Sequence, residues 1–283
     1  MIINPRITQK IAFSFLLLAT LLIIIPVGLI VVTIVIKGTP AISWDFLFTM
    51  PRDGMRAGGI FPAIIGTICL VIGALAFSWP IGVMAAIYLT EYAKDNLLTR
   101  MIKLAIVNLA GVPSVIYGLF GLALFVVFLK FGSSIIAGSL TLGILVLPVI
   151  ISATRVALES VPNSFREVSL SLGASKWQTI RHIVLPNSIP GIMTGTILEV
   201  ARSAGETAPI LFTVAAFYLP RLPQSVFDQV MALPYHLYVI STQIPNIDAK
   251  TTYGTALVLL SMVLFVNLIA IIIRYKLRKN KKW

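Results

Sequence analysis

Three ionisable residues interrupt an otherwise apolar stretch late in the chain: Glu199, Arg202 and Glu206. Their spacings of three and four place all three on one face of a helix, flanked by the hydroxyls of Ser203 and Thr207. Charges inside a membrane cost at least about 2.5–3.5 kcal/mol each, so these groups must face protein or water. An arginine fork suits the oxygens of an oxyanion, and an ionised glutamate accepts hydrogen bonds only from a protonated one. The strip therefore predicts a pathway for an anion such as phosphate; an internal ion pair that only fixes helix packing is the alternative.

A polar island between two apolar stretches, Glu159–Pro186, is the second candidate site. We expect two short helices here, separated at Gly173, because glycine tolerates the positive φ of a sharp reversal. Pro186 and Pro190 are expected to end the second helix before the next span. Such an amphipathic segment either rests on the lipid surface with Trp177 as its anchor, or docks on a partner protein.

The composition is that of a membrane protein. Hydrophobic residues make up 58% of the 283 residues and charged residues 11%, against about 45–50% and 25% in soluble domains. About 20 apolar residues in helical conformation cross a bilayer, and six runs qualify, the fourth being the shortest. The predicted spans are Ile11–Ile36, Ile60–Leu89, Leu104–Leu129, Ser139–Ala153, Gly191–Phe217 and Tyr253–Ile273. The predicted fold class is therefore all-α, a polytopic membrane protein with six transmembrane helices.

The net charge of +12 divides unevenly between the two sides of this topology. With both ends on one side, fifteen basic residues fall there and six on the other, while Arg202 stays inside a span. The fifteen are Arg6, Lys10, Lys94, Arg100, Lys103, Arg155, Arg166, Lys176, Arg181, Arg274, Lys276, Arg278, Lys279, Lys281 and Lys282; the six are Lys37, Arg52, Arg56, Lys130, Arg221 and Lys250. The positive-inside rule therefore places both termini in the cytoplasm. This pattern orients the chain in a membrane and does not indicate a nucleic-acid partner.

Several kinds of chemistry are excluded by the residue types available. The single cysteine, Cys69, sits in the middle of a span, which excludes a disulfide framework and a cysteine-based metal site. The two histidines, His182 and His236, fall on opposite sides of the predicted membrane, so they cannot share a metal. The sequence has no G-x-x-x-x-G-K-[ST] phosphate cradle for ATP. We therefore expect that the chain has no metal or cofactor of its own and is not an enzyme.

The island and the charged strip contain three motifs that resemble those of a known family. They are Glu167-x5-Gly173-x9-Ile183-x-Leu185-Pro186, Pro190-Gly-Ile-Met-Thr-Gly195 and Arg202-Ser-Ala-Gly-Glu206-Thr-Ala-Pro209. The first resembles the cytoplasmic loop of ABC-importer permeases. The other two are similar to the A-type permease of bacterial phosphate-specific importers (PstA). The resemblance extends from Ile60 onward and weakens before it. One departure is Val168-Ser169, where the family has two alanines.

The resemblance implies a single permease domain over residues 1–283, with a core at about 60–274 and a cytoplasmic coupling loop at about 155–190. It implies a place in the bacterial cytoplasmic (inner) membrane beside a homologous second permease (PstC-like). It also implies two ATPase subunits (PstB-like) that bind ATP and Mg, and an extracytoplasmic phosphate-binding protein (PstS-like). The residues that it implies for ATPase coupling are Glu167, Gly173, Trp177, Ile183, Leu185 and Pro186. For the translocation pathway it implies Arg202 and Glu206, which match the family's essential pair. Glu199, Ser203 and Thr207 are expected to line the pathway with them because they share the same helix face.

Two alternative functions remain open from the sequence. A permease for molybdate or sulfate would share the loop but not the Arg-x3-Glu-Thr-Ala-Pro motif. A secondary transporter or anion channel that works without ATP would not need the coupling loop. The stretch Leu219–Thr252 is long for a connector, and we expect it to rest on the membrane or to meet an extracytoplasmic partner.

Overall fold

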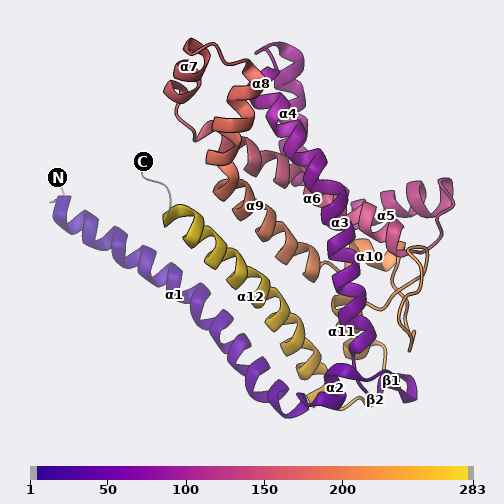
Figure 1. Ribbon diagram of the computed structural model, residues 1–283. Helices are drawn as coiled ribbons and strands as arrows, with labels where there is room; N and C mark the ends of the chain where they lie inside the picture. Colours follow the sequence, from indigo (N-terminus) through magenta and orange to yellow (C-terminus); the bar gives the residue numbers. More distant parts are fainter. Residues whose placement is uncertain (1–4, 280–283) are drawn as a thin grey trace.

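The computed structural model describes residues 5–279, which fold almost entirely into helices (Figure 1). Lys281 and Lys282, counted above for topology, lie outside the described residues. The α-helices are α1 (Pro5–Gly38), α2 (Trp44–Phe48), α3 (Phe61–Ile87), α4 (Leu97–Ala110), α5 (Ser114–Gly121), α6 (Ile135–Glu159), α7 (Asn163–Ser171), α8 (Lys176–Thr179), α9 (Leu185–Gly205), α10 (Ala208–Thr213), α11 (Leu233–Thr242) and α12 (Ala249–Lys279). Two 3-10 turns, η1 (Thr39–Ala41) and η2 (Asp53–Met55), and three π-helical segments, η3 (Tyr88–Tyr92), η4 (Leu122–Phe128) and η5 (Ile180–Val184), complete the helical elements. A two-stranded antiparallel ribbon, β1 (Pro51–Arg52) with β2 (Ala57–Gly58), pairs Pro51 with Gly58.

Five helices among the described residues are long and apolar enough to cross a membrane, and a bent pair makes a sixth span if it is counted as one. The five run over Gln9–Ala41, Phe61–Tyr92, Ile135–Glu159, Lys176–Gly205 and Ala249–Lys276. The all-α polytopic fold is thus confirmed. In Figure 1 the start of α1 and the end of α12 lie toward the α7 end, opposite the β1–β2 ribbon. α1 packs along α12 and is exposed on almost every face, as expected for a helix surrounded by lipid.

The third predicted span is wrong as a single helix. α4 ends at Ala110 and α5 begins at Ser114, with a bend of 100° between Leu97–Ala110 and Ser114–Phe128. Pro113 explains the break, because a proline disfavours the helical conformation of the residue before it and lacks the N–H that a helix needs. The result is two half-length helices in place of a straight rod.

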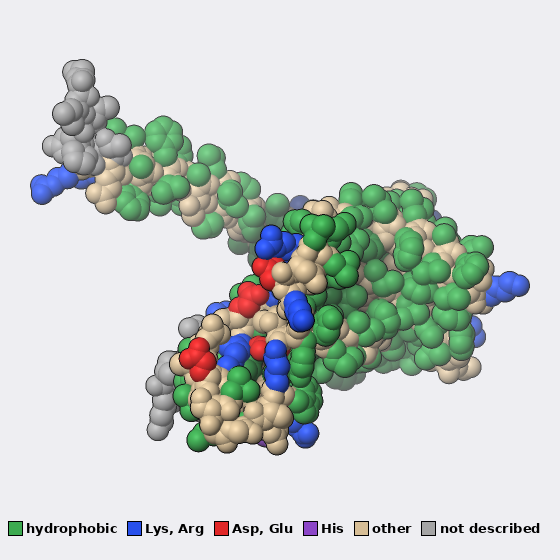
Figure 2. All heavy atoms as spheres, turned by 90° about the horizontal axis from the view of Figure 1, so that it is seen from above, with side chains coloured by type: hydrophobic (Ala, Val, Ile, Leu, Met, Phe, Trp, Pro, Cys, Tyr) green, Lys and Arg blue, Asp and Glu red, His purple; other side chains and the backbone are tan. Residues whose placement is uncertain are grey.

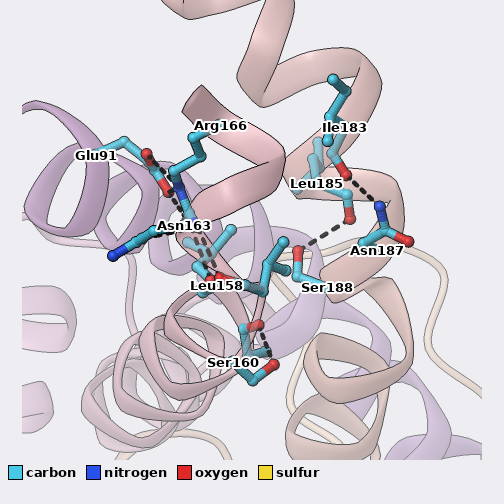
Figure 3. Close-up of polar contacts among 11 residues, drawn as sticks. Glu91, Leu158, Ser160, Asn163, Arg166, Ile183, Leu185, Asn187 and Ser188 are labelled. Atoms are coloured by element: carbon cyan, nitrogen blue, oxygen red, sulfur yellow. Dashed lines mark hydrogen bonds and ion pairs between the residues drawn. The ribbon is translucent and has the colours of Figure 1, made fainter. Parts of the chain in front are cut away.

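The fifth predicted span, Gly191–Phe217, is also corrected. Helix runs continuously from α8 through η5 into α9 and ends at Gly205, where Glu206 turns to an extended conformation. The sequence predicted that Pro186 and Pro190 end the second loop helix. This prediction is wrong, because the helix continues through both residues. Side-chain donors bond carbonyl oxygens near both prolines: the Asn187 amide donates to Ile183 at 2.8 Å and the Ser188 hydroxyl to Leu185 at 2.9 Å (Figure 3).

The stretch after α10 folds back into the protein instead of lying wholly outside it. Met231 and Leu233 are buried, and the Leu233 amide donates to the Thr67 hydroxyl of α3 at 2.8 Å. Gly66 of α3 permits this approach, because a Cβ there would clash with the Met231 carbonyl oxygen. This part of the predicted outer connector therefore belongs to the main core, together with α11.

Figure 2 views the molecule from the end that carries α7 in Figure 1. Hydrophobic side chains cover most of the visible surface, while Lys, Arg, Asp and Glu gather over one part of this end. This arrangement suits a body embedded in lipid with one polar end in water.

Candidate functional site

The polar island forms two helices around a sharp turn, as predicted. α7 ends at Ser171, Gly173 has φ +83°, and α8 begins after Ser175. Ser175 and Gln178 form a reciprocal capping box: the Gln178 side chain accepts from the Ser175 amide at 2.7 Å, and the Ser175 hydroxyl accepts from the Gln178 amide at 3.3 Å. These local contacts satisfy two backbone amides at the start of α8 and define where this helix begins.

The departure from the family pattern at Val168-Ser169 has a structural counterpart. Ser169 is buried where α7 meets α8, and its hydroxyl lies 2.9 Å from that of Thr179. Because a buried hydroxyl without a partner costs free energy, this pair lets a polar residue replace the small apolar one between the two helices. Val168 points outward and is 60% exposed, so it does not affect the contact.

The island has exposed apolar side chains, and no other residue that the structure describes covers them. Leu172 is 83% exposed, Trp177 52% and Leu170 49%, and Glu167 is exposed beside them. The other residues expected for coupling are Ile183 and Leu185, both half-buried, and Pro186, which is exposed. An apolar face with an acidic residue fits a docking surface, and it equally fits a lipid interface, so the geometry alone keeps both interpretations.

Arg166 is a residue of this region that the sequence did not single out. It lies on α7, and its guanidinium forms an ion pair with Glu91 of η3, with Nη2 2.7 Å from Oε1 and Nε 3.2 Å from the same oxygen (Figure 3). Its Nη2 also donates to the Leu158 carbonyl at 3.0 Å, and Nη1 donates to Val161 at 2.7 Å and to Asn163 at 3.4 Å. All five N–H groups of the guanidinium thus have acceptors.

The charged strip lies where α9 ends, about midway between the α7 end and the β1–β2 ribbon in Figure 1. Arg202 Nε lies 3.4 Å from Glu206 Oε1, and Nη1 lies 4.0 Å from Glu199 Oε2. Glu199 is buried, and its Oε2 has no hydrogen-bond partner among the described residues. Ser203 is buried, and Thr207 is half-buried in the interruption before α10. The structure therefore brings the three charged residues together at a helix break and not along an unbroken helix.

Arg202 differs from Arg166 in how fully its donors are used. Its side chain is 42% exposed, against 16% for Arg166. Its Nε donates to Glu206 Oε1 at the long distance of 3.4 Å. Its two terminal nitrogens, Nη1 and Nη2, donate no hydrogen bond to any residue that the structure describes. An exposed guanidinium with terminal donors to spare can bind an oxyanion by two parallel hydrogen bonds.

A cavity of about 780 Å³ lies between α6 and α9, next to the charged strip but not lined by it. On α9 its lining runs from Pro190 to Leu198, one helical turn short of Arg202, and Arg274 of α12 also lines it. Its polar lining residues are Ser152 of α6, Ser160 just after α6, Thr194 of α9 and Arg274, and the remaining lining residues are apolar or glycine. The described residues contain no group of three or more His, Cys, Asp or Glu that could hold a metal ion.

Known proteins with similar sequences are permeases. The family described as "Binding-protein-dependent transport system inner membrane component" matches residues 78–282. The chain is 34% identical to "Probable ABC transporter permease protein YqgI" of Bacillus subtilis, over 93% of this chain and 94% of that protein. It is 33% identical to "Phosphate transport system permease protein PstA 1" of Mycobacterium tuberculosis, over 99% of this chain and 92% of that protein.

Solved structures with the same fold belong to ABC transporters. The methionine ABC transporter MetNI in an inward-facing conformation matches with a TM-score of 0.60 at 15% identity, covering 76% of this chain and 94% of that one. A bacterial alginate ABC transporter matches with a TM-score of 0.58 at 18% identity, covering 95% and 98%. These matches and the helical architecture agree: the chain belongs to the binding-protein-dependent transport system inner membrane component family, as the permease component of an ABC importer and not its ATPase.

Proposed function

We propose that this chain is one of two permease subunits of an ATP-driven importer for inorganic phosphate in a bacterial cytoplasmic membrane. It pairs with a homologous second permease, sits on two ATPase subunits that bind ATP and Mg, and receives phosphate from an extracytoplasmic binding protein. Both termini face the cytoplasm. Phosphate as the substrate is supported by the relatives named as phosphate transport permeases.

The observation that carries this proposal is the guanidinium of Arg202, exposed at a helix break and with its terminal donors unused by the described residues. Interrupted helices near the middle of the membrane form substrate sites in many transporters. The contacts to Glu199 and Glu206, at 4.0 and 3.4 Å, are longer than the roughly 2.7–2.9 Å of strong charge-assisted bonds. A loosely held arginine can exchange its carboxylate partner for a passing anion and release it again.

Selectivity follows from the neighbouring carboxylates. An ionised glutamate accepts hydrogen bonds and donates none. Protonated phosphate carries an O–H that Glu206 can accept, whereas sulfate at neutral pH carries none and meets only repulsion. The same reasoning disfavours a general anion channel, because a channel that admits any anion needs no hydrogen-bond acceptor such as Glu206 beside the Arg202 guanidinium.

Coupling to ATP follows from the continuity of α8, η5 and α9. The second helix of the loop, α8, and Arg202 lie on one continuous helix, Lys176–Gly205. A displacement of the loop by closing ATPase subunits therefore reaches Arg202 without crossing a flexible connection. The cavity between α6 and α9 supports a route for the anion on the cytoplasmic side of Arg202, because its lining includes Arg274 and ends at Leu198, one helical turn from Arg202.

Co-purification and uptake together test the proposal. The tagged chain, purified from native membranes, should bring down a second permease and an ATPase that mass spectrometry identifies. Cells that express the complex should take up radiolabelled phosphate, and excess sulfate or molybdate should not compete. Competition by either anion would favour another oxyanion as substrate, and uptake that survives deletion of the ATPase would contradict the coupling.

The proposed orientation has its own test. In a Cys69→Ser background, single cysteines at Ser171 in α7 and at Asp53 in η2 should react from opposite sides with a membrane-impermeant thiol reagent. We expect only Asp53→Cys to be labelled in intact cells. Equal labelling from outside would refute the orientation.

A further inference from the structure

The ion pair between Glu91 and Arg166 joins parts of the chain that are 75 residues apart in sequence. Glu91 lies in η3, at the end of the span that contains α3, and Arg166 lies on the exposed loop helix α7. The pair is largely buried, with 7% of the Glu91 side chain and 16% of the Arg166 side chain exposed. The carbonyls of Leu158 and Val161, at the end of α6, accept from the same guanidinium.

The polypeptide chain connects the loop directly to α6 and to α9, but not to α3. α6 leads into α7 through Ser160 and Pro162, and α8 continues into α9. α3 has no covalent connection to the loop, yet it packs closely against α6. The guanidinium of Arg166 is therefore a polar link between η3, at the end of the α3 span, and both the loop and the end of α6. Lys176 of α8, with its Nζ 5.2 Å from the centre of the Tyr92 ring, is a second and weaker contact between the loop and η3.

We propose that the Glu91–Arg166 pair is a positioning element for energy coupling: it makes α3 follow the loop, so that α3, α6 and α9 move as one body when the ATPases close. This inference rests on the proposed ATP-coupled function. Without the pair, the loop would still pull α9 directly, but α3 would lag behind. The pathway would then open incompletely while ATP is still hydrolysed.

An apolar contact competes with this interpretation. Ala86 of α3 and Leu89 of η3 form an apolar cluster with Leu158, Val161 and Val184. Phe165 of α7 packs against this cluster. If apolar packing alone transmits the motion, the ion pair only adds stability. In that case its loss lowers the amount of folded protein and leaves the yield of transport per ATP unchanged.

Arg166→Gln and Glu91→Gln distinguish these two roles when each is measured in the purified complete complex in liposomes. We expect phosphate imported per ATP hydrolysed to fall about threefold to thirtyfold for Arg166→Gln, the range typical of residues that carry coupling. Arg166→Lys should also be impaired, because one ammonium cannot reach the same five acceptor positions. Arg100→Gln is the matched control, since Arg100 forms a bidentate pair with Asp95 that is 67% and 71% exposed. We expect it to leave the ratio unchanged.

A rescue experiment tests the link itself. In a Cys69→Ser background, Glu91→Cys combined with Arg166→Cys should couple poorly while the thiols are free, and should recover when a flexible bis-maleimide joins them. The ratio of binding-protein-stimulated to basal ATP hydrolysis gives a second measure of coupling that does not depend on the substrate. If the wild-type complex shows this stimulation but imports no phosphate, the proposed substrate fails. If both measures are the same in wild type and Arg166→Gln, or if cross-linking restores nothing, the inference fails.

Discussion

Gly173 provides the sharpest test of the coupling loop. Its φ of +83° lies in the left-handed region, and a Cβ added there would meet nothing within 4 Å. The Cβ that Gly173→Val introduces therefore meets no other atom, and we expect the backbone to cause most of the effect. An L-residue in the left-handed conformation costs about 1–2 kcal/mol, and a β-branched residue is especially disfavoured there.

That cost acts on a turn held by few contacts. The Gly173 amide donates to the Leu170 carbonyl at 3.0 Å, and the Ala174 amide donates to Ser169 at 3.2 Å. A penalty of about 1–2 kcal/mol lowers the population of this turn about fivefold to thirtyfold relative to alternative turns. We expect phosphate uptake to fall by a similar factor and the ATPase to be recovered less in pull-downs, while the amount of permease in the membrane stays near wild type.

Gly132→Val is the matched control for this substitution. Gly132 has φ +67° and also has nothing within 4 Å of an added Cβ, but it lies between η4 and α6, away from the loop. The backbone penalty should be similar and the ATPase recovery unchanged. Equal loss of ATPase binding in both variants, or none in either, would refute the reasoning that the turn at Gly173 shapes a docking surface.

Three further outcomes are expected. Glu206→Gln should retain part of the phosphate uptake and admit sulfate slightly better in competition assays, because a repelling charge has gone; unchanged exclusion of sulfate would contradict this. Arg274→Gln should slow phosphate uptake, whereas Lys276→Gln, which removes the same charge from the same helix outside the cavity lining, should not; equal rates in the two variants would remove the cavity from the route. Two backbone N–H groups hold the pKa of Asp228 below its usual range, so its stabilising contribution is present at neutral pH and is lost as pH falls through that lowered pKa. Asp228→Asn should accordingly speed amide hydrogen exchange in its turn at neutral pH, and the difference from wild type should vanish at low pH; a difference that persists there would contradict this cause.

The local features of the loop were predictable from the sequence because each depends on neighbouring residues. A glycine between two amphipathic segments predicted a reversal, and Gly173 has the positive φ that this requires. The number of apolar runs likewise predicted a polytopic all-α fold. These inferences use composition and periodicity, which do not depend on distant contacts.

The helix boundaries were less predictable, because whether a proline ends a helix depends on the residues around it. Pro113 does break a span, whereas Pro186 and Pro190 lie in a continuous helix. The surroundings of the prolines differ: the π-helical turn η5 precedes Pro186, and the side chains of Asn187 and Ser188 add hydrogen bonds to the carbonyl oxygens of Ile183 and Leu185. The positions of the prolines in the sequence do not reveal these additional hydrogen bonds.

The Glu91–Arg166 pair was beyond prediction from a single sequence. Its members lie on different helices, and many pairings of acidic and basic residues would have been equally compatible with the topology. The grouping of Glu199, Arg202 and Glu206 was predictable from their spacing, although helix geometry accounts only for Glu199 and Arg202, and Glu206 meets Arg202 from the extended residue after α9. What the spacing did not reveal is the end of α9 at Gly205, which leaves Arg202 exposed.

The most direct test of the central claim is the initial rate of phosphate uptake by the purified complex in liposomes, with ATP on the side of the loop. We predict ATP-dependent uptake by the wild type, poor uptake by Arg202→Lys, which keeps the charge but loses the planar fork, and almost none by Arg202→Gln. The double variant Arg202→Gln with Glu206→Gln removes both partners of the ion pair, so it should recover folding but not transport. Wild-type uptake by this double variant would show that Arg202 is only a structural partner of Glu206 and would contradict the account.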